Sequence, residues 1–247
     1  MIPVIAPQWP APANVRAFFT TRKGGVSLPP YAELNLGTHV GDASDAVVRN
    51  RVLVSNLLPT EPAWLDQVHG VKVVCAEAPA TRRADASVAV QPGAVCVVMV
   101  ADCLPVLLCN RAGSVVGAAH AGWRGLLDGV LESTLAAMNV PPHEVLAWLG
   151  PAIGPTQFEV GPEVRQAFVE RDARDAVHFR IGRDDRWLAD IFGLARARLT
   201  RAGVNSDAVS GGGDCTVSDP LRFFSYRREG VCGRMGAFIW MDPIGQT

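Results

Sequence analysis

The sequence lacks the marks of several protein classes. It contains neither a GxGxxG nor a GxxxxGK[ST] phosphate loop, which argues against the common dinucleotide-binding and P-loop enzymes. The net charge of −1 creates no overall field that favours nucleic acid or an acidic membrane. The longest apolar run, residues 94–101, is far too short to span a bilayer. The proline-rich stretch 1–15 has no basic side chain and is not a secretory signal, so we expect a cytoplasmic protein.

Cysteine pairs with a recognisable spacing are also missing. The six cysteines form no CxxC pair and no regular framework, so reduced thiols are expected rather than disulfides. Cys96 and Cys109 lie in apolar, strand-like runs, where a free thiol behaves as a small hydrophobic side chain. With 247 residues, 49% of them hydrophobic, the chain can form one large domain or two small ones.

The hydrophobic pattern predicts an α+β fold with mixed sheets, because strand-like and helix-like segments alternate irregularly and hairpin-like pairs are frequent. The continuous Val-rich run at 95–100 is typical of a strand that is buried on both faces. Further strands are expected at 16–21, 71–76, 104–108, 114–119, 144–149, 223–227 and 235–240. Helices are expected at 45–58, 126–138, 162–170 and 188–201.

Three potential metal ligands stand in separate polar motifs: His69 in QVHG, Cys103 in ADC and His120 in HAGWR. Two imidazoles and a thiolate suit zinc, and three protein ligands leave a fourth tetrahedral position open, as in catalytic zinc sites. The spacings of 34 and 17 residues match no zinc finger, so folding must assemble the set. Singly, each residue has an ordinary explanation as a core thiol or a hydrogen-bonded histidine, and spacing alone leaves both interpretations open. Asp102, beside Cys103, should face away from a shared metal because adjacent side chains alternate in extended backbone.

Candidate substrate contacts are fewer. Arg22 stands in TTRKGG, where glycines allow close backbone approach to an anion and the guanidinium fork suits phosphate. Asn35, between two leucines, is expected to fix a loop or to contact substrate, since buried amides need partners. Arg124, Arg227 and Arg228 lie in glycine- or aromatic-flanked segments, with a solvated surface position as the default for each and Arg227 as a third candidate substrate contact.

Taken together, the motifs resemble the YfiH-like family, also called the laccase-domain or multicopper polyphenol oxidase family. Its members are described as purine nucleoside phosphorylases with adenosine deaminase activity. The resemblance covers roughly residues 16–240 and rests on an ordered set of short motifs: TTRKGGVS, LNLG, NR, QVHG, ADCLP, HAGWRG, GPAIG and FFSYRR.

This resemblance implies one α+β domain over residues 1–247, related to the cysteine-hydrolase domain of cytotoxic necrotizing factor. It implies that His69, Cys103 and His120 gather at one zinc site with catalytic roles. Purine nucleosides (adenosine, inosine, guanosine and methylthioadenosine) and phosphate would be the substrates. No nucleic-acid or membrane partner is expected.

Two other classes compete with this interpretation: a metal-free cysteine hydrolase and a non-enzymatic partner-binding protein, for which the sequence gives no exposed-patch or charge signal. A metal-free cysteine hydrolase, including a peptidoglycan-editing one, would use Cys103 as nucleophile and His120 or His69 as base. A copper polyphenol oxidase is disfavoured, because five histidines cannot supply a blue-copper site and a His-rich trinuclear cluster. Copper could still bind the site adventitiously, since it exceeds zinc in affinity for such ligands.

Overall fold

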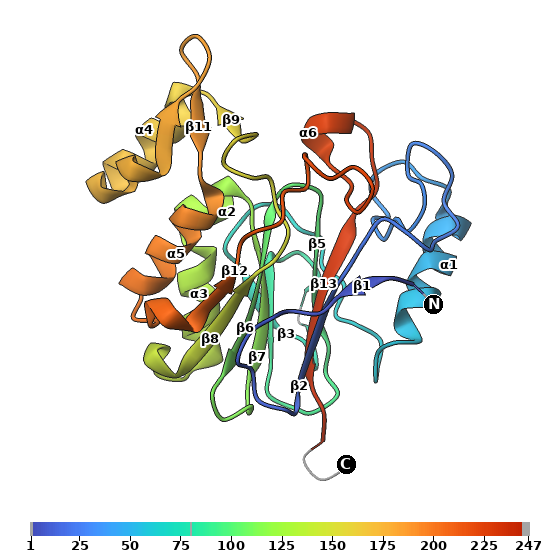
Figure 1. The fold of residues 1–247 in the computed structure, drawn as a ribbon. Helices are drawn as coiled ribbons and strands as arrows, with labels where there is room; N and C mark the ends of the chain where they lie inside the picture. Colours follow the sequence, from blue (N-terminus) through green and yellow to red (C-terminus); the bar gives the residue numbers. More distant parts are fainter. Residues whose placement is uncertain (1, 80, 244–247) are drawn as a thin grey trace.

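Two stacked β-sheets with helices on both outer faces form the body of the protein in the computed structural model, which describes residues 2–79 and 81–243 (Figure 1). The expected α+β class with mixed sheets is confirmed. The larger sheet contains, in spatial order, β12 (Val209–Gly211), β8 (Val145–Leu149), β6 (Leu104–Asn110), β7 (Val116–Ala121), β4 (Ala86–Ala89) and β3 (Val73–Cys75). The smaller sheet contains β1 (Val4–Ile5), β2 (Val15–Thr20), β13 (Met235–Met241) and β5 (Cys96–Val100).

Helices cover the two sheets unequally. On the larger sheet lie α2 (Trp123–Asp128), α3 (Val130–Met138) and α5 (Ile191–Arg201), and on the smaller sheet lies α1 (Ser44–Ser55) (Figure 1). A small outlying lobe combines α4 (Pro162–Arg171) with the three-stranded sheet of β10 (Phe179–Ile181), β11 (Trp187–Ala189) and β9 (Glu159–Val160). The short helix α6 (Tyr226–Glu229) lies just before β13. No helix within the described ranges is long and apolar enough to cross a membrane.

The central strands are apolar throughout because both of their faces are covered. In β5, Val97 and Met99 pack toward α1, whereas Val98 and Val100 pack into the core between the two sheets. This alternation explains why the sequence shows a continuous run rather than a polar–apolar pattern. The chain leaves the smaller sheet at the end of β5 and enters the larger sheet at β6. Cys103 lies in this crossing.

Two expected elements differ in the structure. The single helix expected at 126–138 is two helices, because Gly129 adopts φ +105°, a left-handed conformation that ends α2 and precedes α3. The segment 223–227 is not a strand. Its aromatic residues Phe223 and Phe224 are fully buried in a loop, and Ser225 then caps α6 by accepting a hydrogen bond from the Arg228 N–H.

Smaller differences concern boundaries. His120 lies within β7 rather than after it. The first residues of the helix expected at 188–201 belong to β11, and α5 begins after Asp190, whose side chain accepts from the Gly193 N–H. The helix expected at 45–58 is α1, which begins at Ser44 after Ala43, a residue with no side-chain cap bond, and ends at Ser55. The strand β4 carries alanine and serine, residues with little strand preference, and was not expected.

Candidate active site

His69 is held by its backbone rather than by neighbours in a helix or strand. It adopts φ +60°, an uncommon conformation for a residue with a side chain. The Asp85 carboxylate accepts hydrogen bonds from three successive backbone N–H groups, those of Val68 (3.1 Å), His69 (2.9 Å) and Gly70 (2.8 Å). Gln67 fixes the same loop to β5 through paired hydrogen bonds of 2.7 and 2.8 Å with the backbone of Met99. Hydrogen bonds within the protein therefore fix the conformation of the loop that carries His69.

The same carboxylate also orients His120. Asp85 Oδ1 lies 2.9 Å from His120 Nδ1, and both side chains are buried. The two residues are further tied by a 2.7 Å bond from the His120 N–H to the Asp85 carbonyl. Burial by itself raises the pKa of Asp85, but the hydrogen bonds with His120 and Gly70 outweigh burial and lower the pKa. Asp85 is therefore an anion that positions both histidines.

Cys103 completes the group from the turn between β5 and β6. The preceding residue, Asp102, adopts φ +90°. The Cys103 Sγ lies 3.7 Å from His69 Nε2, and the ligand atoms of His69, Cys103 and His120 all lie within 4.8 Å of one another. Glycine at position 122 permits this approach, because a Cβ there would lie 2.9 Å from His69 Cδ2 and 3.0 Å from Cys103 Sγ.

The thiol and the buried imidazole alter each other's protonation. Burial raises the pKa of Cys103, but the charge and hydrogen bonds of His120, followed by those of His69, outweigh it and lower the pKa to about 6. Burial lowers the pKa of His120, whereas Cys103 and Asp85 outweigh it and raise the pKa to about 9. Both shifts favour a thiolate at Cys103 beside an imidazolium at His120. A thiolate with two imidazoles is also a donor set that suits zinc.

Asp102 faces away from this group, as the sequence indicated. Its Oδ1 accepts from the Thr216 hydroxyl (2.6 Å) and its Oδ2 accepts from the Arg227 N–H (2.7 Å). Its carbonyl accepts from the Ile153 N–H (2.9 Å). Asp102 thus joins the Cys103 turn to α6 and to the loop that follows β8.

Two hollows adjoin at His69, Cys103 and Tyr226. We call one the aromatic hollow; it has a volume of about 260 Å³ and is walled by Trp123, Ile153, Phe158 and Ile191, with Arg124 and Arg227 at its polar part. We call the other the cationic hollow; it has a volume of about 350 Å³ and is lined by His39, Gln67, Met99, His120 and Arg234. Their sizes are near the lower end of small-molecule sites.

The expected substrate contacts are placed very differently. Arg227 lines the aromatic hollow, with its guanidinium anchored to the Glu159 carbonyl at 2.8 Å. Asn35 is fully buried and lines neither hollow. Its amide donates to Gly37 and Asp42 and accepts from the Gly37 and Arg234 N–H groups, as expected of a loop-fixing residue.

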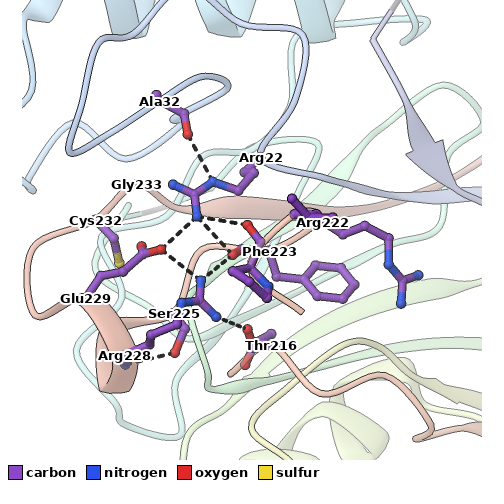
Figure 2. A network of polar contacts seen from close by, with 12 residues as sticks. Arg22, Ala32, Thr216, Arg222, Phe223, Ser225, Arg228, Glu229, Cys232 and Gly233 are labelled. Carbon is purple, nitrogen blue, oxygen red and sulfur yellow. Dashed lines mark hydrogen bonds and ion pairs between the residues drawn. The ribbon is translucent and has the colours of Figure 1, made fainter. Parts of the chain in front are cut away.

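Arg22 also lies outside both hollows, and its guanidinium has internal partners (Figure 2). Nη1 donates to Glu229 Oε1 at 2.7 Å, and Nε donates to the Ala32 carbonyl at 3.0 Å. The same Glu229 oxygen accepts from Arg228 at 2.8 Å, so the carboxylate lies between two guanidinium groups. These contacts join Arg22 to the end of α6, and they place its guanidinium in a network beside the site rather than in either hollow.

Sequence reasoning missed two residues of the site. Asp85 is a lone carboxylate between alanines at the start of an apolar segment, and such a buried charge signals a partner. Tyr226 lies next to Arg227 in the expected strand 223–227, and its place between the hollows depends on α6, which local pattern did not indicate.

The chain is similar over almost its whole length to several known proteins. Residues 16–242 match the family described as "Multi-copper polyphenol oxidoreductase laccase". The chain is 54% identical to purine nucleoside phosphorylase YfiH of Escherichia coli, over 98% of this chain and 100% of that one. It is 53% identical to a purine nucleoside phosphorylase of Pseudomonas aeruginosa, over 96% and 98% of the two chains. The crystal structure of a Neisseria meningitidis DUF152 protein superposes with a TM-score of 0.94 at 51% identity, covering 97% of this chain and 99% of that one.

Proposed function

The chain belongs to the YfiH family of laccase-like multicopper polyphenol oxidoreductases, and we propose that it is a zinc-dependent purine nucleoside phosphorylase with adenosine deaminase activity. The convergence of His69, Cys103 and His120 beside two hollows is the observation that carries the proposal. The names of full-length relatives at 54% and 53% identity support the phosphorylase part. The deaminase part rests on the chemistry of the donor set.

The donor atoms suit zinc in number and kind. Zinc bound by two imidazoles and a thiolate supplies a Lewis acid that stabilises negative charge developing beside it. The chain's own contribution is to fix the donors: the Asp85 carboxylate accepts from His120 Nδ1, so Nε2 is the nitrogen left for a metal. Copper would fit the same atoms with high affinity, so weak oxidase activity after copper loading would carry little weight.

Phosphorolysis requires two substrates to meet at one carbon. A phosphate oxygen forms a bond with C1′ of the ribose, and the bond from C1′ to the purine nitrogen breaks. The electron pair of that bond leaves with the base, which takes up a proton, and ribose 1-phosphate is the second product. Two adjoining hollows beside the three donor residues can hold the two substrates together, which is the main contribution of binding to such a reaction.

Deamination would use the nucleoside alone. Water adds to the purine carbon that bears the amine, the bond from carbon to nitrogen breaks, and ammonia leaves with a proton from the water. Zinc deaminases of other folds use a mixed His/Cys ligand set for this chemistry. The open, exposed side of His69 gives a nucleoside access to the donor group.

The copper oxidase alternative finds little support in the positions of the histidines. In the described part of the chain, the three donor residues are the one cluster of His, Cys or acidic side chains suited to a metal. His143 and His178 line neither hollow.

A cysteine hydrolase remains the second candidate, because one arrangement favours it. Cys103, His120 and Asp85 form a thiolate, an imidazolium and an orienting carboxylate, the order of groups found in cysteine hydrolases. Such an enzyme would need no metal.

The experiment that separates these proposals is a nucleoside assay on protein purified without added metal. We expect about one zinc per chain and release of hypoxanthine from inosine that requires phosphate. Chelation should abolish the activity, and zinc should restore it. Full activity in metal-free protein, or no phosphate-dependent product, would contradict the proposal.

A further inference from the structure

Tyr226 is an exposed aromatic residue whose neighbours along the chain are anchored. Its side chain is on the four-residue helix α6, 60% of the residue is exposed, and it lines both hollows. Its neighbour Arg227 is held by Asp102 through the backbone, and Arg228 and Glu229 belong to the network with Arg22 (Figure 2). An aromatic side chain held at the junction of two hollows is well suited to contact a ligand rather than to support the core.

The walls of the aromatic hollow match a flat, apolar ligand. Trp123 is partly buried, and Phe158, Ile153 and Ile191 are 7%, 3% and 1% exposed, so the surface they offer is rigid and apolar. The Asp102 carboxylate in this hollow already has its hydrogen bonds with Thr216 and Arg227. Aromatic surfaces bind purine bases by stacking, and Tyr226 completes such a surface on the side of the donor residues.

The cationic hollow has the opposite character. His39 and Arg234 line it, and a further hollow that shares His39, Gln67 and Met99 adds Arg51 and Arg82. Among the described residues lining these two connected hollows, Asp66 is the one carboxylate. Burial, followed by the positive charges of Arg234 and Arg51, lowers the pKa of His39, which is consistent with a positive potential here. An anion is the ligand that such surroundings favour.

We infer that the two hollows are separate subsites: the purine base binds in the aromatic hollow against Tyr226, and phosphate binds in the cationic hollow at His39 and Arg234. The ribose then lies beside Cys103 and His69, with its C1′ between the attacking phosphate oxygen and the departing base. This assignment rests on the proposed phosphorylase function, and it adds which residues select which substrate.

Two pairs of variants test the assignment by direct binding and by kinetics. Tyr226→Ala should raise the dissociation constant for inosine, measured calorimetrically without phosphate, by about 5- to 150-fold, the range expected from losing one stacking contact. Tyr226→Phe keeps the ring and should bind inosine nearly as wild type does. His39→Ala should raise the KM for inorganic phosphate by about 12- to 150-fold, the range for one hydrogen bond to a charged group. His143→Ala removes an exposed histidine elsewhere and is the matched control.

Phosphate-independent deamination of adenosine provides an internal check. Tyr226→Ala should impair it, whereas His39→Ala should not. The assignment is overturned if Tyr226→Ala leaves inosine binding unchanged, or if His39→Ala weakens inosine binding and spares phosphate. It is also overturned if wild-type protein binds neither ligand. If wild type binds inosine but releases no hypoxanthine with phosphate, the proposed function fails. The dissociation constants of Tyr226→Ala and Tyr226→Phe for inosine still test where the base binds.

Discussion

His120 donates from Nδ1 to Asp85 Oδ1 across 2.9 Å, and the other Asp85 oxygen accepts from the Val68 and Gly70 N–H groups. A carboxylate anion only accepts hydrogen bonds, so His120 keeps a proton on Nδ1, and Nε2 is the nitrogen that becomes free for a metal when the imidazolium loses its second proton. One buried carboxylate therefore sets both the tautomer of His120 and the conformation of the loop that carries His69.

Replacing Asp85 should weaken the metal site without removing a ligand. Asp85→Asn loses the negative charge and puts an amide N–H within reach of groups that already donate. We expect metal affinity to fall about 10- to 100-fold, the range typical of residues that orient metal ligands. Competition with a chromogenic chelator measures the change. Asp207→Asn, at an exposed position, is the control, and equal affinity in both variants would contradict the role of Asp85.

Gly122→Ala should disturb the site by crowding. The added Cβ would lie 2.9 Å from His69 Cδ2 and 3.0 Å from Cys103 Sγ, so both side chains must shift. We expect a loss of stability of about 1–3 kcal/mol from overpacking, together with weaker metal binding. Thermal unfolding and metal titration measure these effects. Gly213→Ala has nothing within 4 Å of the new Cβ and should leave both unchanged.

The thiol should titrate early in metal-free protein. The folded pKa of Cys103 is about 6, below its ordinary value of 9.0, so the thiolate persists above pH 6 and is lost as the pH falls through that value. Alkylation of the Cys103 peptide by iodoacetamide, followed by mass spectrometry after chelation, should show a midpoint near pH 6. Urea-unfolded protein supplies the comparison, with a midpoint near the ordinary value. Identical midpoints would show that His120 and His69 do not stabilise the thiolate.

Arg22→Ala tests whether this residue supports the fold or binds phosphate. Its guanidinium donates to Glu229, which also pairs with Arg228, and its side chain is 15% exposed. Losing a hydrogen bond to a charged group costs about 1.5–3 kcal/mol, so the melting temperature should fall and both reactions should weaken together. Arg49→Ala, which breaks an exposed pair with Asp45, should change little. Unchanged stability with a selectively raised KM for phosphate would restore the role expected from sequence.

Features with a local cause were predictable from the sequence. The strand β5 was visible because both faces are buried, and Cys103 was noticeable because it follows that apolar run. The pattern could not show that helix 126–138 breaks, because Gly129 in a helical stretch signals only a weaker helix until its φ of +105° is known. The sequence likewise predicted a strand at 223–227. Phe223 and Phe224 are buried in a loop instead, so their apolar character reflects burial and not a strand.

The site was only partly predictable for a similar reason. Residue type and the polar motifs QVHG, ADC and HAGWR indicated His69, Cys103 and His120, whose atoms the fold brings within 4.8 Å. Asp85 is 35 residues from His120, and only the antiparallel pairing of β4 with β7 makes them neighbours. Arg22 has the chemistry of a phosphate ligand, but the sequence could not show that its Nη1 donates to Glu229, 207 residues away.

The metal content and activity of Cys103→Ser test the central claim most directly, because the two candidate functions assign the thiol different roles. If Cys103 is a metal ligand, the folded variant should lose zinc and phosphate-dependent hypoxanthine release together, since a serine hydroxyl is a poor replacement for a thiolate ligand. Cys75→Ser, at an exposed thiol, should keep both. A folded, inactive Cys103→Ser protein that retains wild-type zinc would contradict the account and favour a cysteine nucleophile.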